Sequence, residues 1–265
     1  MQTVLVVLGV ALSPAVLASP VGGAAPSEDC RFEERLAPYQ DQLDGLLTRD
    51  LPRELFQAPE AEGLLAETAE VRGRVVDALD CRATTTLSTA PFQLSKLAAV
   101  HLGEGWRHLD DGNARLAVER ATEIVRLGRT LSGGSLLVSR VGLALERDAV
   151  ALLEAAGASA PALPPRATQA EVLRTEATGQ AELRWAYCTH LGTLGDCLSS
   201  FVSGTSETID LSGTRALADA TEAEPLQADE PVPALSGSVG VARQLATLVR
   251  ERAEVDARLE ALGEG

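Results

Sequence analysis

Two histidines in this chain have side chains suited to acid–base or metal chemistry. His101 and His108 lie in the segment "HLGEGWRH", with Glu104 between them, and offsets of three and seven residues from His101 place all three on one side of a helix. Side chains on one side of a helix can converge on a metal ion. The apolar face of this helix is centred elsewhere, so we favour boundary histidines that hydrogen-bond to neighbouring residues.

Asp148 is the most informative polar residue, because a helix over 135–156 would place it in the middle of an apolar face. This face is formed by Leu137, Val141, Ala144, Leu145, Leu152 and Ala155. A buried carboxylate needs a partner, since an unpaired buried charge costs several kcal/mol. A His–Asp pair in a pocket can act as a general base, but no nucleophile stands at a suitable spacing, which favours a structural ion pair. We assign no catalytic residue, no metal ligand and no cofactor. If the three central helices alternate in direction, the expected partners of Asp148 are His101, His108, Trp106 and Arg120.

The four cysteines are better explained by disulfide bonds than by a metal site or a reactive thiol. In "YCTHLGTLGDC" the tight Cys-x₂₋₄-Cys pairs of structural zinc sites are missing. In one continuous helix Cys188 and Cys197 would lie about 13 Å apart, so the glycines between them must let the chain reverse. We predict a Cys188–Cys197 bond and a Cys30–Cys81 bond that closes the open end of a helical hairpin, although the sequence alone does not decide the pairing.

Four arginines are candidates for contact with an acidic partner. Arg115, Arg126 and Arg129 share a narrow sector of a helix over 114–131, and such a stripe can receive carboxylates. The favoured interpretation is a solvated face crossed by ion pairs within the chain, because Glu119 follows Arg115 by four residues. The fourth candidate, Arg252, interrupts an otherwise aliphatic seam of the last helix as a charged register point.

Apolar periodicity predicts an all-α fold, an antiparallel bundle of about six to seven helices with a long heptad-patterned C-terminal helix. Nothing alternates with period two for long enough to indicate a sheet. The helix over 114–131 carries a seam of mostly small residues, which predicts close helix contact. The seam consists of Ala117, Ala121, Ile124, Gly128 and Leu131. The expected helices cover 27–50 with Ser27 as N-cap and a kink at Pro38, then 59–82, 92–111, 114–131, 135–156, 168–187 and 238–262.

The stretch "LGEGWRHLDDGNARLAVERATEIVRLGRTL" resembles a tetratricopeptide hairpin, with Leu102-Gly103, Trp106 and Ala117 as matching residue types. Its turn is about two residues longer than in that repeat, and no second copy follows at the repeat period. The resemblance implies helical-hairpin geometry for these residues and not membership of the family.

The first residues are typical of a secretory signal peptide. An apolar run from Val4 to Leu17 precedes small residues suited to cleavage after Ala18, and this run is shorter than the roughly 20 residues of a membrane span. A buried helix or an uncleaved anchor are the alternatives, because no basic residue precedes the run. The predicted organisation is a signal peptide at 1–18, a short linker at 19–27, an N-terminal helical bundle at 28–158, a Pro-rich linker at 159–167 and a C-terminal helical region at 168–265 with an acidic loop at 202–236 that has room for a short helix at 214–220.

Composition limits the class of partner. A net charge of −15 argues against nucleic acid and against an anionic membrane surface. We therefore expect an exported acidic protein of the cell envelope, secreted or periplasmic, which acts as a non-enzymatic interaction or scaffold protein with a protein partner and an oligomeric state that the sequence leaves open. The alternatives are a hydrolase or metal-dependent enzyme that uses His101, His108 and Asp148, and a small-ligand binder with a pocket between helices gated by the arginine stripe.

Overall fold

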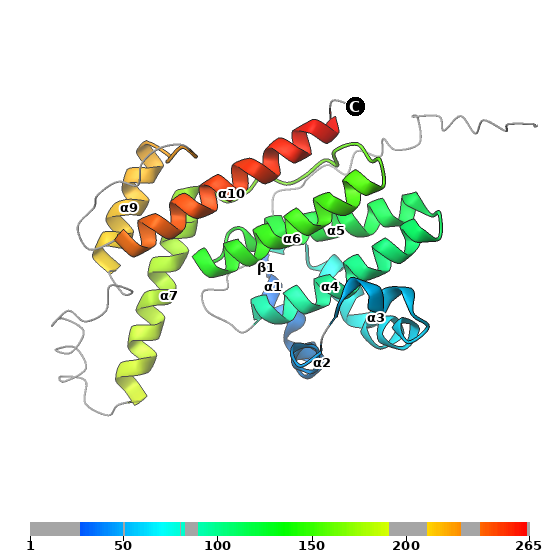
Figure 1. The fold of residues 1–265 in the computed structure, drawn as a ribbon. Coiled ribbons are helices and arrows are strands. Elements are labelled where there is room, and N and C mark those ends of the chain that lie inside the picture. Colours follow the sequence, from blue (N-terminus) through cyan, green and yellow to red (C-terminus); the bar gives the residue numbers. More distant parts are fainter. Residues whose placement is uncertain are drawn as a thin grey trace, which may run out of the picture.

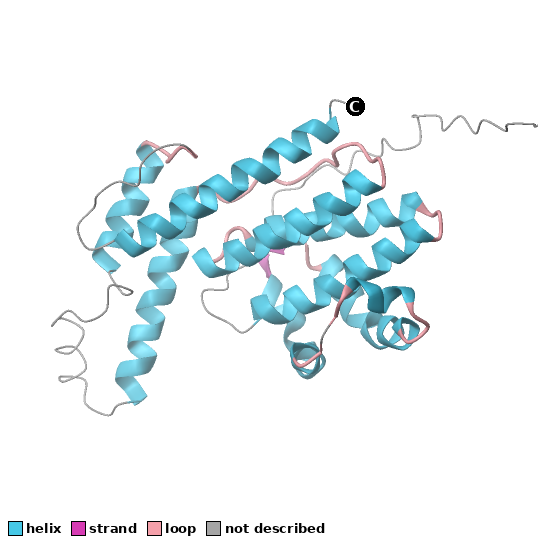
Figure 2. Cartoon of the chain, viewed as in Figure 1, coloured by secondary structure: helices cyan, strands magenta, loops and turns pink. Residues whose placement is uncertain are grey.

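The chain folds into packed α-helices, as predicted from its periodicity (Figures 1 and 2). The computed structural model describes residues 27–49, 51–79, 81–82, 90–190, 211–228 and 239–263. The signal peptide predicted at 1–18 and Cys197 lie outside these residues. The helices are α1 (Phe32–Leu36), α2 (Gln40–Leu47), α3 (Ala61–Asp77), α4 (Ala90–Asp110), α5 (Ala114–Leu131), α6 (Leu136–Ala155), α7 (Gln169–His190), α9 (Leu211–Ala223) and α10 (Val239–Gly263), with the 3₁₀ helices η2 (Ala37–Tyr39) and η3 (Arg53–Gln57).

The beginning of the described chain corrects the predicted first helix. Strand β1 (Ser27–Arg31) pairs in parallel with the short strand β2 (Cys81–Arg82), so Ser27 is not an N-cap and the helix begins only at Phe32. The chain is then interrupted by η2, which contains the Pro38 that predicted a kink. The strand pair places the backbone around Cys30 beside Cys81. The Cys30–Cys81 bond itself stays a prediction.

Helices α4, α5 and α6 pack on one another at the centre of the molecule. Tight turns connect them. Gly112 adopts a left-handed φ of 79° between α4 and α5, and the Asn113 side chain then accepts a hydrogen bond from the Leu116 N–H at 3.4 Å as N-cap of α5. Ser135 caps α6 by accepting from the Val138 N–H. These caps fix where α5 and α6 begin. They therefore set which side chains of these two helices face their neighbours.

The small-residue seam of α5 is buried, and its C-terminal part, with Gly128, packs closely against α6. A Cβ atom added at Gly128 would lie 2.5 Å from the Gly142 carbonyl oxygen, and one added at Gly142 would lie 2.6 Å from the Gly128 carbonyl oxygen. The two backbones therefore touch, which only glycine at both positions permits.

The C-terminal half is attached to this centre by α10, which lies along α6 (Figure 1). The two helices run in the same direction, because Arg140 of α6 is level with Glu251 of α10 and Glu154 is level with Arg258. Helices α7 and α9 form an antiparallel pair beside them, in which Arg174 pairs with Glu222 and Thr214 contacts Gln180.

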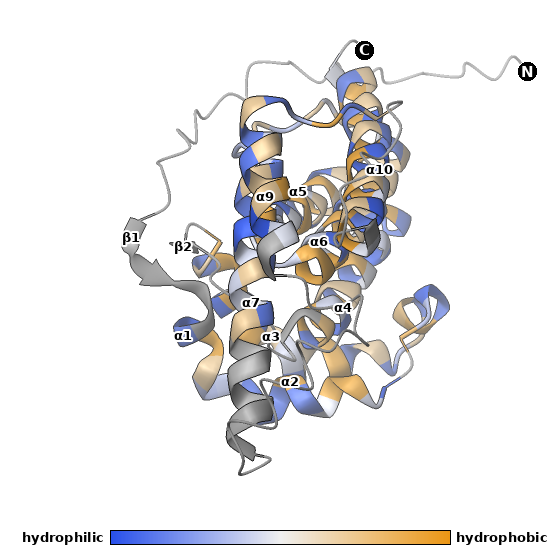
Figure 3. Cartoon of the chain, turned by 90° about the vertical axis from the view of Figure 1, so that its left-hand side faces the viewer, coloured by the Kyte–Doolittle hydropathy of each residue, from blue (hydrophilic) through white to orange (hydrophobic). Residues whose placement is uncertain are grey.

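Helix α9 occupies part of the acidic loop predicted at 202–236, and the short helix expected at 214–220 lies within it. The helix is longer than expected, so the loop prediction is wrong for residues 211–213 and 221–223. Thr214, Leu217, Ala218 and Thr221 are buried on one side of α9 at helical spacing, and this pattern was hidden by the polar composition around it. Figure 3 shows the same alternation of hydrophobic and hydrophilic residues around the other helices. None of the described helices has both the length and the apolarity of a membrane span.

Candidate functional site: two buried charge networks and an open groove

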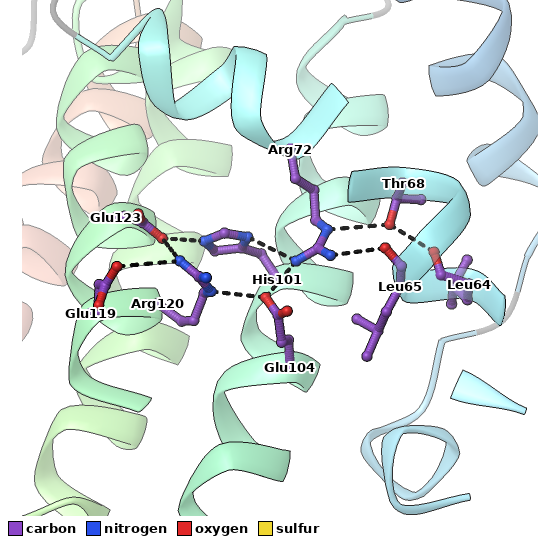
Figure 4. A network of polar contacts seen from close by, with 9 residues as sticks. All are labelled: Leu64, Leu65, Thr68, Arg72, His101, Glu104, Glu119, Arg120 and Glu123. Carbon is purple, nitrogen blue, oxygen red and sulfur yellow. Dashed lines mark hydrogen bonds and ion pairs between the residues drawn. The ribbon is translucent and has the colours of Figure 1, made fainter. Parts of the chain in front are cut away.

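His101 lies in a buried network of charged side chains that joins α3, α4 and α5 (Figure 4). Its Nε2 atom is 2.6 Å from a Glu123 carboxylate oxygen, and its Nδ1 atom is 3.4 Å from Nη1 of Arg72. Arg72 also donates to Glu104, and Arg120 completes the set by donating to Glu104 and Glu123 at 2.8 Å each. We call these five residues the His101 network.

The partners of His101 occupy both nitrogens of its ring. Nε2 contacts the Glu123 carboxylate and Nδ1 contacts Nη1 of Arg72. Two arginines and two glutamates surround the imidazole, so the charges of opposite sign in this cluster are paired. The nitrogen that a catalytic base would offer to a substrate faces Arg72 instead, and the adjacent cavity of about 10 Å³ holds a single water at most.

The charges of the His101 network stabilise the ionised form of both glutamates. Burial raises the pKa of Glu104, but the charge and hydrogen bond of Arg72 and the charge of Arg120 outweigh it, and the pKa lies below its usual range. The same holds for Glu123, where burial is outweighed by the hydrogen bond and charge of His101 and by those of Arg120, so that its pKa is also lowered. Each carboxylate is thus held as a charged partner at neutral pH.

A second buried network holds α10 against the bundle, and we call it the Glu146 network. Glu146 of α6 has only 1% of its side chain exposed and receives Arg129 of α5 at 3.0 Å and Arg166 of the segment between α6 and α7. Both arginines also pair with Asp256 of α10, from Arg129 at 3.2 Å. Four parts of the chain that are distant in sequence therefore meet at two carboxylates.

Arg252 joins the Glu146 network through backbone oxygens. It donates to the carbonyls of Ala167 at 3.1 Å and Ser132 at 3.4 Å, and Ser132 is the C-cap residue of α5, where the helix dipole places partial negative charge. Burial, then the nearby charge of Arg166, lowers the pKa of Arg252 to about 10. Arg252 is therefore part of an internal joint, and the prediction that it contacts an external partner is wrong.

Asp148 lies where the sequence did not predict it. Its side chain is 60% exposed and its nearest cation is Arg147 at 3.8 Å, so none of the predicted partners contacts it and the idea of a buried His–Asp pair is wrong. The buried acid of α6 is Glu146, two residues earlier. The small residues Ser139, Gly142 and Ala149 share the buried side with Glu146, and centring the helix on them would have found it.

The remaining sequence candidates are separate from one another. His108 is half-buried near the end of α4, about two helical turns beyond His101. The two histidines do not converge. Trp106 stacks under the Arg53 guanidinium, which lies 3.8 Å from the ring centroid. Arg115 pairs with Glu119 at 3.5 Å on the surface of α5, as the solvated alternative expected. Arg126 is half-buried, and Arg129 points inward, so the arginine stripe is not a single exposed surface.

An open groove of about 330 Å³ lies between α6 and α10 on the outer side of the Glu146 network. Its floor is apolar, and Leu137, 47% exposed, stands at one end. The α6 rim carries Arg140 and Arg147, and the α10 rim carries Glu251, Glu254 and Arg258. The volume is in the range of sites that bind ligands or partner side chains.

The fold and these sites define an all-α bundle with two internal charge networks and one amphipathic groove. Within the part of the chain that the structure describes, no three His, Cys, Asp or Glu side chains are grouped as metal ligands would be. The chain matches no protein-family model, no curated protein and no solved structure.

Proposed function

We propose that this chain is an exported, non-enzymatic interaction protein of the cell envelope that binds a protein partner in the groove between α6 and α10. The observation that carries this proposal is the groove itself, which combines an apolar floor with charged rims on two rigid helices. That combination suits the packing of a helix into a groove, where apolar side chains supply affinity and flanking charges supply specificity.

The enzyme alternative depended on His101, His108 and Asp148, and the positions of these residues support a non-enzymatic role instead. His101 is enclosed by Arg72 and Glu123, and Asp148 lies exposed on another helix. The trio of His101, His108 and Asp148 is therefore not assembled as the hydrolase or metal-enzyme alternative needs. Export is proposed from the apolar run at 4–17 and from the even number of cysteines beyond it.

Site-directed photo-crosslinking in the cells that produce the protein tests this function. A photoreactive amino acid in place of Ala144, in the groove, is expected to give a protein adduct of defined mass. The same group in place of Arg115, 75% exposed on α5, is the matched control and is expected to give none. Absence of any adduct specific to position 144 would overturn the proposal.

A further inference from the structure

The outer side of α6 carries a second apolar stripe that the fold leaves partly exposed. Leu137, Val141 and Ala144 follow one another at spacings of four and three residues and line the groove, whereas the buried side of α6 packs against α5. Apolar residues with this spacing are the knobs of helix–helix packing. Helix α10 lies along one edge of this stripe, and the groove between the two helices leaves room for a further neighbour.

The charges on the two rims are unequally engaged within the chain. Arg258 donates to Glu154 at 2.9 and 2.8 Å and is fully used. Arg140 is only 3.9 Å from Glu251, and Arg147 is 3.8 Å from Asp148, both beyond hydrogen-bond distance. The α6 rim therefore offers two guanidiniums, and the α10 rim offers Glu251 and Glu254.

We propose that the occupant of the groove is a second copy of this chain, packed face to face about a two-fold axis parallel to α6 and α10. This inference rests on the proposed function and names its partner. A rotation of 180° about such an axis keeps every residue at its level along the helices and exchanges the two sides, so that α6 of each copy faces α10 of the other. The basic rim then meets the acidic rim twice.

The levels of the side chains agree with this arrangement. Arg140 and Glu251 are at the same level within one chain because they are 3.9 Å apart, so Arg140 of one copy opposes Glu251 of the other. Arg147 lies two helical turns beyond Arg140 and Glu254 about one turn beyond Glu251, an offset of roughly 6 Å that a long arginine side chain leaning toward its helix N-terminus spans. Leu137 of each copy packs against the other copy's groove floor.

Charge-reversal variants of the purified full chain, studied by sedimentation velocity, test the proposal. Arg147 and Glu254 are the suitable pair, because both side chains are exposed. Within the described residues, neither makes a close contact that the folded chain needs. The wild type is expected to sediment as a dimer. Arg147→Glu alone and Glu254→Arg alone place like charges opposite each other twice, so each is expected to weaken dimerisation at least 10-fold.

An equimolar mixture of the two variants is the decisive measurement. In the mixed dimer the two substituted side chains face each other with opposite charges, and the unsubstituted Arg147 and Glu254 face each other as in the wild type. Dimers are therefore expected to return to the wild-type level, and this recovery also shows that both variants are folded. A matched variant outside the groove, Glu119→Arg, is expected to leave the dimer unchanged.

Three results would overturn the inference: a wild type that stays monomeric up to about 10⁻⁴ M, where interfaces of standard size associate, a dimer insensitive to both reversals, or a mixture that stays monomeric. These failures are distinguishable from failure of the proposed function. A monomer with a groove-specific adduct to a different protein at position 144 keeps the proposed function and removes self-association, whereas a monomer with no adduct removes both.

Discussion

The two buried networks differ in charge balance and in what they connect. The His101 network has two arginines and two glutamates around a histidine, and it joins α3, α4 and α5, which follow one another in the chain. The Glu146 network has three arginines to two carboxylates and joins α5 and α6 to α10, about 100 residues later. The His101 network connects helices that are neighbours in the sequence, whereas the Glu146 network connects α10 to helices of the central bundle.

This difference teaches how each network keeps its charges buried. Every member of the His101 network has an alternative partner, because Arg120 reaches both glutamates and Arg72 also donates to the Leu65 carbonyl at 3.0 Å. The Glu146 network depends on one carboxylate that is almost wholly enclosed, and part of its excess positive charge is met by the end of α5. Removing one residue should therefore affect the two networks unequally.

The largest effect is expected from Glu146→Gln. Loss of this charge leaves Arg129 and Arg166 buried beside each other with only the half-exposed Asp256 as carboxylate partner, so the free energy of unfolding should fall by about 3–5 kcal/mol. The matched variant Glu104→Gln should cost clearly less, because Arg120 keeps Glu123. Denaturant unfolding of both variants measures the difference, and equal losses would contradict the comparison.

A smaller loss of stability is expected from Gly128→Ala, because the new methyl group on α5 would collide with Glu146. The added Cβ would lie 2.4 Å from Cγ of Glu146 and 2.5 Å from the Gly142 carbonyl oxygen, so α5 and α6 must separate at a cost of about 1–3 kcal/mol. Gly73→Ala in α3 is the control, since nothing lies within 4 Å of that position and alanine should stabilise the helix by up to about 1 kcal/mol. Thermal unfolding should move the two variants in opposite directions.

The smallest effect is expected from acid, and it should be specific to the His101 network. The pKa of Glu123 is lowered in the folded chain, so its contribution to stability is complete above the unfolded value of about 4.3 and is lost as the pH falls through the folded value. The stability difference between wild type and Glu123→Gln should therefore shrink as the pH falls below about 4. Glu119→Gln, exposed on the same helix, should show no such dependence.

Helix existence was predictable because apolar spacing is a local property, and the central hairpins and the tight α5–α6 contact follow from the residues between Asn113 and Leu131. The orientation of α6 was predicted wrongly, because this helix has apolar residues on two sides and the prediction buried the side with larger residues. The small residues Ser139, Gly142 and Ala149 mark the side that faces the core. The predicted apolar face, with Leu137 and Val141, is in part the open groove. The same error moved Asp148 into the core and left Glu146 unnoticed.

Residue types and spacing were enough to predict the helical class, the small-residue seam of α5 and the single charged position, Arg252, in the last heptad pattern. The packing of distant helices was needed to show that Arg252 points to the end of α5, that Glu123 and not Asp148 faces His101, and that a groove stays open beside α10. Helical periodicity depends on neighbours a few residues away, which are fixed along the chain. The choice of a partner for a buried charge depends on which distant helices pack together.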